Sequence, residues 1–245
     1  FDVMDMDGEG SKWNPIPFDL MCFKQIVNAR QHAIDWNTLF WGNHDQPRVV
    51  SRFGSNVSEE LRVRSAKMLA TAMYLLRGTP FLYQGEEIGM TNTKFRSPDE
   101  MKDPVTHAVF EMASGLHLPD RIGFRLMRCA ARDNARTPMQ WDSSANAGFN
   151  MGTKPWQCLN PDYKKINVKA DLAASSTTVT DPLHPAFDPG RSIYRFYQKV
   201  LAIKKSDPVL LYGSTIEYYP DDRQVISYSR SYEGKRFLIV GNFSG

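Results

Sequence analysis

A short apolar run that ends in polar side chains constrains the fold of this chain more than any other stretch. Residues 39–41, Leu-Phe-Trp, predict a buried strand, and Asn43, His44 and Asp45 follow where that strand would stop. In parallel α/β architectures the chemistry gathers at this end of the strands. An ionised Asp beside a His suits a site where positive charge develops in a substrate, because the carboxylate stabilises the cation. The tripeptide alone leaves a capped turn open as the alternative.

Helical and strand-like segments alternate on both sides of this run. A strand-like start at residues 1–4 is followed by apolar positions at helical spacing over residues 18–34. A second helix is predicted between the cap residue Ser58 and Gly78, and a further strand over residues 79–83. This β-α-β-α-β order predicts an α/β fold with a parallel sheet, which is either part of a barrel or a doubly wound sheet.

The rest of the chain predicts two long connections, one more helix and a group of short strands. Residues 91–131 form a mostly polar excursion with a short helix near 106–113, and residues 170–191 are expected to be a surface loop. Asp188 and Pro189 are expected to start the last helix as its cap and first-turn proline. After that helix the pattern changes to short strands, at residues 215–219, 225–228 and 237–240.

Composition and charge exclude several classes of partner. The 245 residues carry 30 basic and 27 acidic side chains, so neither nucleic acid nor an anionic membrane is expected as a partner. No apolar run approaches the roughly 18 residues that span a bilayer. The three cysteines lie far apart without metal-binding spacing. We therefore expect free buried thiols, a reducing and hence cytoplasmic location, and no metal or other cofactor.

Three stretches resemble the alpha-amylase family of glycoside hydrolases. Residues 43–54, Asn-His-Asp-Gln-Pro-Arg-Val-Val-Ser-Arg-Phe-Gly, resemble its fourth signature region, and residues 78–87 resemble its last barrel strand. Residues 132–142 match a block that is specific to its oligo-1,6-glucosidase and alpha-glucosidase branch. The resemblance implies that residues 1–207 form the C-terminal part of a (β/α)8 TIM barrel, namely strands six to eight and a long loop. It also implies that residues 208–245 begin an all-β sandwich domain.

The resemblance also implies roles for single residues. Asp45 would be the third carboxylate of the family's site, which helps to distort the sugar and stabilises the oxocarbenium-like transition state. His44 would bind the same glucose, and Lys12 would line the next subsite. Arg132 would help to close the pocket around the terminal glucose, a role that suits a guanidinium fork. The implied substrates are α-linked gluco-oligosaccharides.

The two carboxyl groups that perform retaining hydrolysis are expected to lie outside this chain. In the family the nucleophilic Asp and the acid/base Glu belong to barrel strands four and five, which would precede Phe1. Both ends of the chain also look cut, because each lies within strand-like residues. We expect a fragment of a retaining, exo-acting alpha-glucosidase for terminal α-1,6 or α-1,4 bonds, inactive without the N-terminal half of the barrel. Val105 stands where oligo-1,6-glucosidases carry Glu, so the preferred linkage stays open.

Two other functions within this resemblance stay open as alternatives. Sucrose isomerases, like transglucosidases, belong to the same family, but residues 4–7, Met-Asp-Met-Asp, replace the arginine-rich loop of the isomerases. A non-catalytic interaction domain, of the kind found in heavy subunits of amino-acid transporters, would need an upstream membrane helix. Such domains usually lose their site residues, whereas this chain retains residues 43–45 and 132–137. The hydrolase is therefore the favoured prediction.

Overall fold

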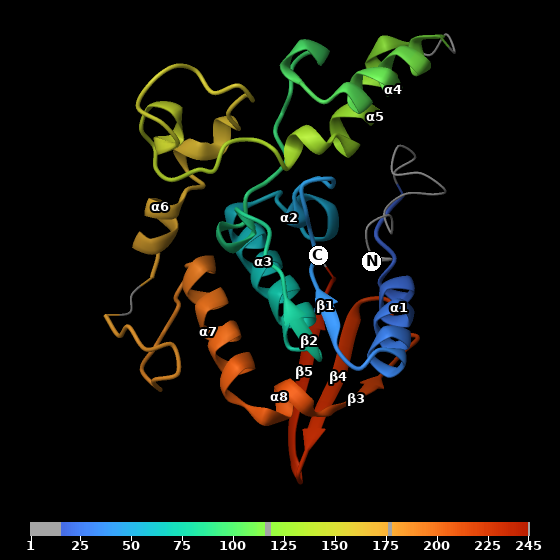
Figure 1. The fold of residues 1–245 in the computed structure, drawn as a ribbon, viewed down its shortest axis with the longest axis vertical. Helices are drawn as coiled ribbons and strands as arrows, with labels where there is room; N and C mark the ends of the chain where they lie inside the picture. The colour runs from blue at the N-terminus through green and yellow to red at the C-terminus, as the bar shows by residue number, and fades with distance from the viewer. Residues whose placement is uncertain (1–15, 116–118, 176–177, 245) are drawn as a thin grey trace.

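A parallel strand pair and an antiparallel sheet are joined by helices in one structure (Figure 1). The computed structural model describes residues 16–115, 119–175 and 178–244. The helices and strands are, in order, α1 (Leu20–Ala33), β1 (Asn37–Leu39), α2 (Val49–Phe53), α3 (Glu59–Tyr74), β2 (Gly78–Pro80), α4 (Pro104–Gly115), α5 (Asp120–Ala130), α6 (Val168–Ala173), α7 (Ile193–Ser206), α8 (Pro208–Tyr212), β3 (Ser214–Tyr218), β4 (Val225–Tyr232) and β5 (Lys235–Asn242). The predicted α/β class is confirmed.

Strands β1 and β2 form the parallel pair from which the Asn-His-Asp loop leaves. Asn37 pairs with Gly78 and Leu39 pairs with Pro80, and helices α2 and α3 form the crossover between the strands. Both strands end earlier than predicted, at Leu39 and at Pro80. One more ladder bond follows, from the Phe81 N–H to the Leu39 carbonyl at 2.8 Å. The polar residues after β1 therefore start at the carboxyl end of this pair.

The two helices that flank this pair form where the sequence predicts them. The Asp19 carboxylate accepts a hydrogen bond from the Met21 N–H at 2.9 Å and starts α1. The Ser58 hydroxyl accepts from the Leu61 N–H at 3.2 Å and starts α3, as predicted. The predicted strand at residues 1–4 lies outside the described residues, so the alternation is confirmed from α1 to β2.

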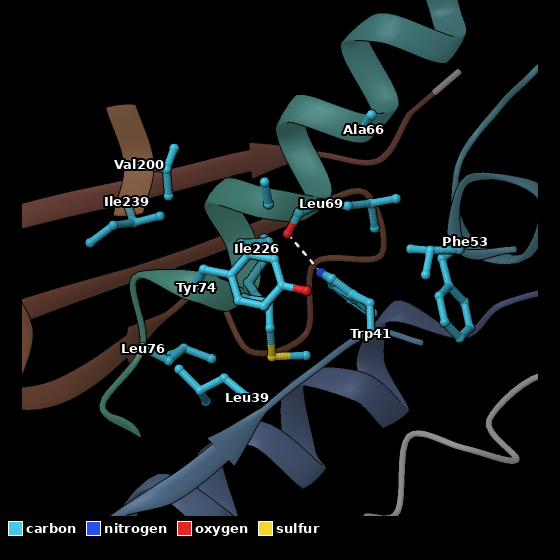
Figure 2. Close-up of a cluster of buried hydrophobic side chains, with 14 of the residues drawn as sticks. Leu39, Trp41, Phe53, Ala66, Leu69, Tyr74, Leu76, Val200, Ile226 and Ile239 are labelled. Atoms are coloured by element: carbon cyan, nitrogen blue, oxygen red, sulfur yellow. Dashed lines mark hydrogen bonds between the residues drawn. The ribbon is translucent and has the colours of Figure 1, made fainter. Parts of the chain in front are cut away.

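Helix α3 lies at the centre of the main core. The Trp41 side chain is 1% exposed and stacks on Phe23 with 4.7 Å between the ring centroids. Its indole N–H donates to the Leu69 carbonyl of α3 at 2.7 Å (Figure 2). Ile226 and Ile239, from β4 and β5, belong to the same buried cluster. The parallel pair, α3 and the C-terminal sheet therefore share one core, and Trp41 anchors the loop that follows β1 to it.

The C-terminal sheet is antiparallel with strand order β3-β4-β5. Glu233 and Gly234 join the last two strands, and their φ angles of 46° and 77° fit the tight turn that right-twisted hairpins favour. All three predicted strands are confirmed, and β4 and β5 are longer than predicted. The division of the chain into domains at residue 207 remains a prediction.

A lysine on α1 fastens this sheet to the helices. The Lys24 side chain is buried, and its ammonium group donates to the carbonyls of Tyr219, Asp222 and Val225 at 2.7, 2.6 and 3.2 Å. The first two carbonyls belong to the connection between β3 and β4, and the third belongs to β4. Burial of an ammonium group is costly unless its donors are satisfied, so this cradle fixes the connection against α1.

The predicted start of the last long helix is wrong. Helix α7 begins at Ile193 with Ser192 as its cap, and Asp188 instead accepts a hydrogen bond from the Gly190 N–H in a local turn. The Asp171 carboxylate accepts from the Ser192 hydroxyl at 2.6 Å and from the Ile193 N–H at 2.9 Å. The segment predicted as a surface loop therefore opens with a helix, α6, whose buried Asp171 completes the cap of α7.

The excursion after β2 contains two helices, one of which was not predicted. Helix α4 (Pro104–Gly115) confirms the helix expected near residues 106–113. Helix α5 packs against α4, and the two project together at the end of the molecule opposite the C-terminal sheet (Figure 1).

Two further predictions concern the surroundings of the protein. Within the described part of the chain, no helix is both long and apolar enough to cross a membrane. Cys22, Cys129 and Cys158 are free thiols, as expected. The expectation that they are buried is wrong, because Cys129 is exposed on α5 and the other two are only partly covered.

Candidate active site

The loop after β1 presents a carboxylate and an imidazole side by side. The Asn43 side-chain oxygen accepts from the Asp45 N–H at 2.8 Å and shapes the turn locally. His44 Nε2 lies 3.3 Å from Asp45 Oδ2. The His44 side chain is 68% exposed and that of Asp45 is 36% exposed, so an incoming ligand can reach both groups.

Two guanidinium groups bind the other carboxylate oxygen of this pair. Asp45 Oδ1 accepts from Arg132 Nη1 at 3.2 Å and from Arg136 Nη2 at 3.0 Å. Arg136 also donates from Nε to the His44 carbonyl at 3.0 Å. Both arginines come from the loop after α5, which is about ninety residues away along the chain. Such charge-assisted bonds fix the orientation of the carboxylate.

A second carboxylate holds the far edge of Arg132. Asp103 accepts from Arg132 Nε at 2.5 Å and from Nη2 at 2.7 Å, which is a two-point pairing with one guanidinium edge. This bond raises the pKa of Arg132 above its ordinary value. Burial is the largest single influence and would raise the pKa of Asp103. The hydrogen bonds from Arg132 and from the Val105 N–H, together with the charges of Arg132 and Arg136, outweigh it, so the net shift is downward. Both partners therefore stay charged near neutral pH.

Buried polar groups fasten Asp103 in turn. Asp133 is 1% exposed, and its Oδ1 accepts from the backbone N–H groups of Lys102 and Asp103 at 2.6 and 3.1 Å. The same oxygen accepts from Gln157 Nε2 at 2.7 Å, and Oδ2 accepts from the Thr106 hydroxyl at 3.2 Å. The start of α4 is therefore tied to the arginine-bearing loop, and Asp103 has a fixed position relative to Arg132.

A cavity of about 340 Å³ lies next to this site along the two parallel strands. Its walls come from β1, β2 and the residues that follow each strand: Thr38, Phe40, Gly42, Asn43, Phe81, Leu82 and Tyr83. The Phe81 side chain is 53% exposed although it is large and apolar. Asn43 belongs both to this cavity and to the Asn-His-Asp loop, so the cavity opens beside the loop that carries Asp45.

One buried acid behind the parallel pair has a strongly shifted pKa. Glu86 is 6% exposed, and its Oε1 accepts from the hydroxyls of Tyr74 and Tyr197 at 2.5 and 2.9 Å. Burial raises the pKa of Glu86 to about 7, against the lowering effect of these two bonds. The tyrosines belong to α3 and α7, which enclose the carboxyl group. Glu86 is therefore a core acid and does not present its carboxyl group to an incoming ligand.

The geometry holds one carboxylate, that of Asp45, in a fixed position where it can stabilise a positive charge. Asp45 supplies a negative charge that two cations orient, which suits the stabilisation of a cation in a bound molecule. No group of three or more metal-binding side chains occurs among the residues that the structure describes. Asp103, the other carboxylate bound to Arg132, has its pKa lowered and is therefore not suited to donate a proton.

Comparison with known proteins decides the family. The profile of the alpha-amylase catalytic domain matches residues 1–213 of this chain. The chain belongs to the alpha-amylase family. The predicted resemblance is thereby confirmed for most of the chain, including the stretches at residues 43–54 and 132–142.

Relatives in the alpha-amylase family cover this chain almost completely. The oligo-1,6-glucosidase of Halalkalibacterium halodurans is 41% identical over 249 residues, which cover 100% of this chain and 41% of that protein. The trehalose-6-phosphate hydrolase of Escherichia coli is 37% identical, with 96% and 40% covered. The chain thus spans about two fifths of the length of the curated relatives that it matches.

Solved structures of the family superpose closely on this chain. A trehalose-6-phosphate hydrolase of Bacillus licheniformis matches with a TM-score of 0.89 and 35% identity, over 100% of this chain and 42% of its own. A trehalulose synthase of Pseudomonas mesoacidophila matches with a TM-score of 0.87 and 37% identity, over 100% and 42%. A trehalose-6-phosphate hydrolase and a trehalulose synthase therefore share this arrangement of elements.

The structure brings together three of the four predicted site residues of this alpha-amylase-family chain. Asp45, His44 and Arg132 lie in one cluster, whereas Lys12 lies outside the described residues. The sequence showed Arg136 only as the second arginine of its block and gave it no separate role. Asp103 was missed altogether, although an Asp directly before Pro104 is the usual signal for a helix cap and α4 begins there.

Proposed function

We propose that this chain is the C-terminal part of the catalytic domain of a retaining, exo-acting alpha-glucosidase. Residues 1–207 would supply strands six to eight of a (β/α)8 barrel and the long loop after strand eight. Residues 208–245 would begin a β-sandwich domain. Family membership, the parallel pair β1–β2 and the antiparallel sheet β3-β4-β5 support this division.

In this proposal Asp45 stabilises the oxocarbenium-like transition state of a terminal glucose. The observation that carries the proposal is the fixed geometry of its carboxylate, which accepts from both Arg132 and Arg136 while Oδ2 faces His44. His44 would bind a hydroxyl of the same glucose, and Arg132 would close the pocket around it. Lys12 would line the next subsite. The substrates would be short α-linked gluco-oligosaccharides, the class on which the name of the oligo-1,6-glucosidases rests.

The chain alone would perform no hydrolysis. Retaining glycosidases need two carboxyl groups about 5 Å apart, one as nucleophile and one as acid/base. In the described residues, Asp103 is bound at both oxygens by Arg132 and Glu86 is enclosed by tyrosines, so neither fits these roles. The cavity along the parallel pair and the exposed Phe81 are suited to receive the preceding half of the barrel.

An isomerase is the second candidate, because trehalulose synthases match as well as the hydrolases do in structure. The segment that distinguishes them in the sequence, residues 4–7, lies outside the described residues. A non-catalytic interaction domain is disfavoured, because the whole cluster around Asp45 is present with its hydrogen bonds. We also propose a cytoplasmic location, on the ground that three cysteines remain unpaired.

The test is to supply the preceding half of the barrel, fused to or mixed with this chain, and to measure glucose released from maltose and isomaltose. We expect no release by the chain alone and release by the completed protein. Asp45→Asn keeps the hydrogen-bond acceptor but removes the charge, so release should fall at least about a hundredfold. Asp181→Asn, a change at an exposed acid, is the matched control and should leave release unchanged.

Two outcomes would contradict the proposal. Glucose release by the chain alone, lost in Asp45→Asn, would mean that two carboxylates within these 245 residues perform the chemistry. An unchanged rate for Asp45→Asn in the completed protein would refute the role of Asp45. Sucrose belongs in the same assay, since conversion to an isomeric disaccharide without net glucose release would favour the isomerase.

A further inference from the structure

The side chain of a buried arginine next to the site contacts two other segments of the chain. Arg48 lies three residues after Asp45 and is 4% exposed. Its guanidinium group donates from Nε to the Asn134 carbonyl at 3.0 Å and from Nη1 to the Gln84 carbonyl at 2.6 Å. Nη2 donates to the carbonyl and hydroxyl of Thr137 at 3.4 and 3.3 Å. One side chain therefore joins the loop after β1, the loop after β2 and the loop that bears the arginines.

Arg48 has no carboxylate partner within the described part of the chain, and its acceptors are neutral oxygens. Burial lowers the pKa of Arg48 to about 10. Removing a guanidinium group from water is unfavourable, and neutral carbonyls compensate less than a carboxylate would. The carboxylates of Glu87 and Asp162 act on Arg48 only through their charge, without a hydrogen bond to it, so the burial of this cation is more than packing needs. This cost suggests a role in positioning the loops that Arg48 connects.

The contacts of Arg48 complete a ring that returns to Asp45. Its bonds to residues 134 and 137 hold the backbone on both sides of Arg136. The Tyr83 hydroxyl, whose ring lies 5.7 Å from the Arg48 guanidinium, donates to the Ala135 carbonyl at 3.1 Å. Arg136 then reaches back to the His44 carbonyl and to Asp45 Oδ1. The position of Arg136 against the carboxylate therefore depends on backbone that Arg48 holds.

We propose that Arg48 is the positioning residue of this site, which sets Arg136 against Asp45 by fixing the backbone of residues 134–137. What the site does with this geometry rests on the proposed function, whereas the geometry itself can be tested without hydrolysis. Arg132 depends less on Arg48, because Asp103 holds it independently by two bonds. The two arginines should therefore respond differently when Arg48 is changed.

The chain offers a matched control for the loss of a buried arginine. Arg230 on β4 is fully buried, donates to the carbonyls of Leu75 and Gly213 at 3.1 and 2.7 Å, and has its pKa lowered to about 10 by burial. It resembles Arg48 in burial and in its neutral acceptors. None of its partners belongs to the candidate site. Arg230→Met thus reproduces the stability cost of Arg48→Met without touching the loops around Asp45.

The experiment is to measure hydrogen exchange of the arginine Nε–H groups by NMR in the purified chain. In Arg48→Met we expect exchange at Arg136 to speed up at least about tenfold, with a smaller change at Arg132. Arg230→Met should change neither rate. In Arg48→Ala, about 20 mM guanidinium should restore slow exchange at Arg136 by filling the vacated position, and the same concentration of urea should not. If Arg48→Met does not fold, exchange at Arg136 is measured instead in Arg48→Lys, which keeps a buried cation.

Each outcome has a separate meaning. Unchanged exchange at Arg136 in a folded Arg48 variant would overturn the positioning role. Equal acceleration in the Arg48 and Arg230 variants would show that lost stability is the cause, and would overturn it as well. If Arg136 responds as expected but the completed protein releases no glucose, the positioning role stands and the proposed function fails.

Discussion

Replacement of Glu86 by Gln should remove the loss of stability that the original chain undergoes as the pH rises from acid to mild alkali. Burial raises the pKa of this carboxyl from the ordinary 4.5 to about 7, so the folded chain keeps a proton that the unfolded chain has already lost. The unfolded state thus binds fewer protons between these two values, and stability falls as pH rises through this window. The contribution of Glu86 is fully present below about pH 4.5 and is lost by about pH 7.

The size of this effect follows from the gap between the two pKa values. A shift from 4.5 to about 7 corresponds to about 3 kcal/mol between pH 4 and pH 8, at 1.36 kcal/mol for each pKa unit. In Glu86→Gln the amide oxygen can still accept from Tyr74 and Tyr197. The amide nitrogen replaces Oε2, which accepts no hydrogen bond within the described residues, so part of the gain is lost to an unsatisfied donor.

Urea unfolding of both proteins, followed by circular dichroism at several pH values between about 4 and 8, measures this difference directly. The stability of Glu86→Gln relative to the original chain should rise by about 3 kcal/mol across this range. Glu60→Gln, a change at an exposed acid on α3, should show no such trend. A difference between Glu86→Gln and the original chain that is independent of pH would refute the reasoning, because it would show that Glu86 titrates alike in both states.

Three further changes test the packing and capping described above. Trp41→Ala should lower the free energy of unfolding by about 3–5 kcal/mol, because it leaves a cavity in the core. Trp156→Ala, at a residue 74% exposed, should cost less than about 0.5 kcal/mol. Equal costs of the two changes in urea unfolding would contradict the burial of Trp41 in the core. Asp171→Ala should lower the free energy of unfolding by about 2 kcal/mol, because it removes the acceptor at the start of α7. Asp188→Ala should leave it almost unchanged. The reverse order in urea unfolding would support Asp188 as the helix cap, as the sequence predicted. Lys24→Met should cost about 2 kcal/mol and speed amide exchange in the connection between β3 and β4, and an unchanged exchange rate would refute the carbonyl cradle.

Local signals predicted the elements that depend on neighbouring residues. Ser58 starts α3 because its hydroxyl caps a backbone N–H three residues ahead, which sequence spacing reveals. The hairpin between β4 and β5 follows from Gly234, which tolerates the positive φ that this turn requires. Asp188 carried the same kind of signal and misled, because the cap of α7 is Ser192, which Asp171 from another helix holds in place. The contribution of Asp171 comes from across the fold and leaves no mark in the residues next to the helix.

The candidate site likewise contains residues that the sequence indicated and residues that only the structure shows. Asp45 and Arg132 could be proposed because their stretches resemble a family, and the structure brings their side chains together. Asp103 could not be proposed, because its pairing with Arg132 exists only when α4 folds back over the loop after α5. The same holds for Arg48, whose partners lie 36 to 89 residues away along the chain. Contacts of this kind depend on the fold as a whole.

The cradle around Lys24 has a consequence for how the C-terminal hairpin can evolve. Its three acceptors are main-chain oxygens of Tyr219, Asp222 and Val225, which every amino acid supplies. Side chains at these positions can therefore vary without loss of the acceptors, provided that the path of the backbone is kept. Among the side chains, the lysine makes all three hydrogen bonds of this attachment, while the Asp222 carboxylate shapes the backbone that accepts them. Position 24 should consequently tolerate few replacements, whereas a change in the connection between β3 and β4 should affect this attachment only where it alters the path of the backbone.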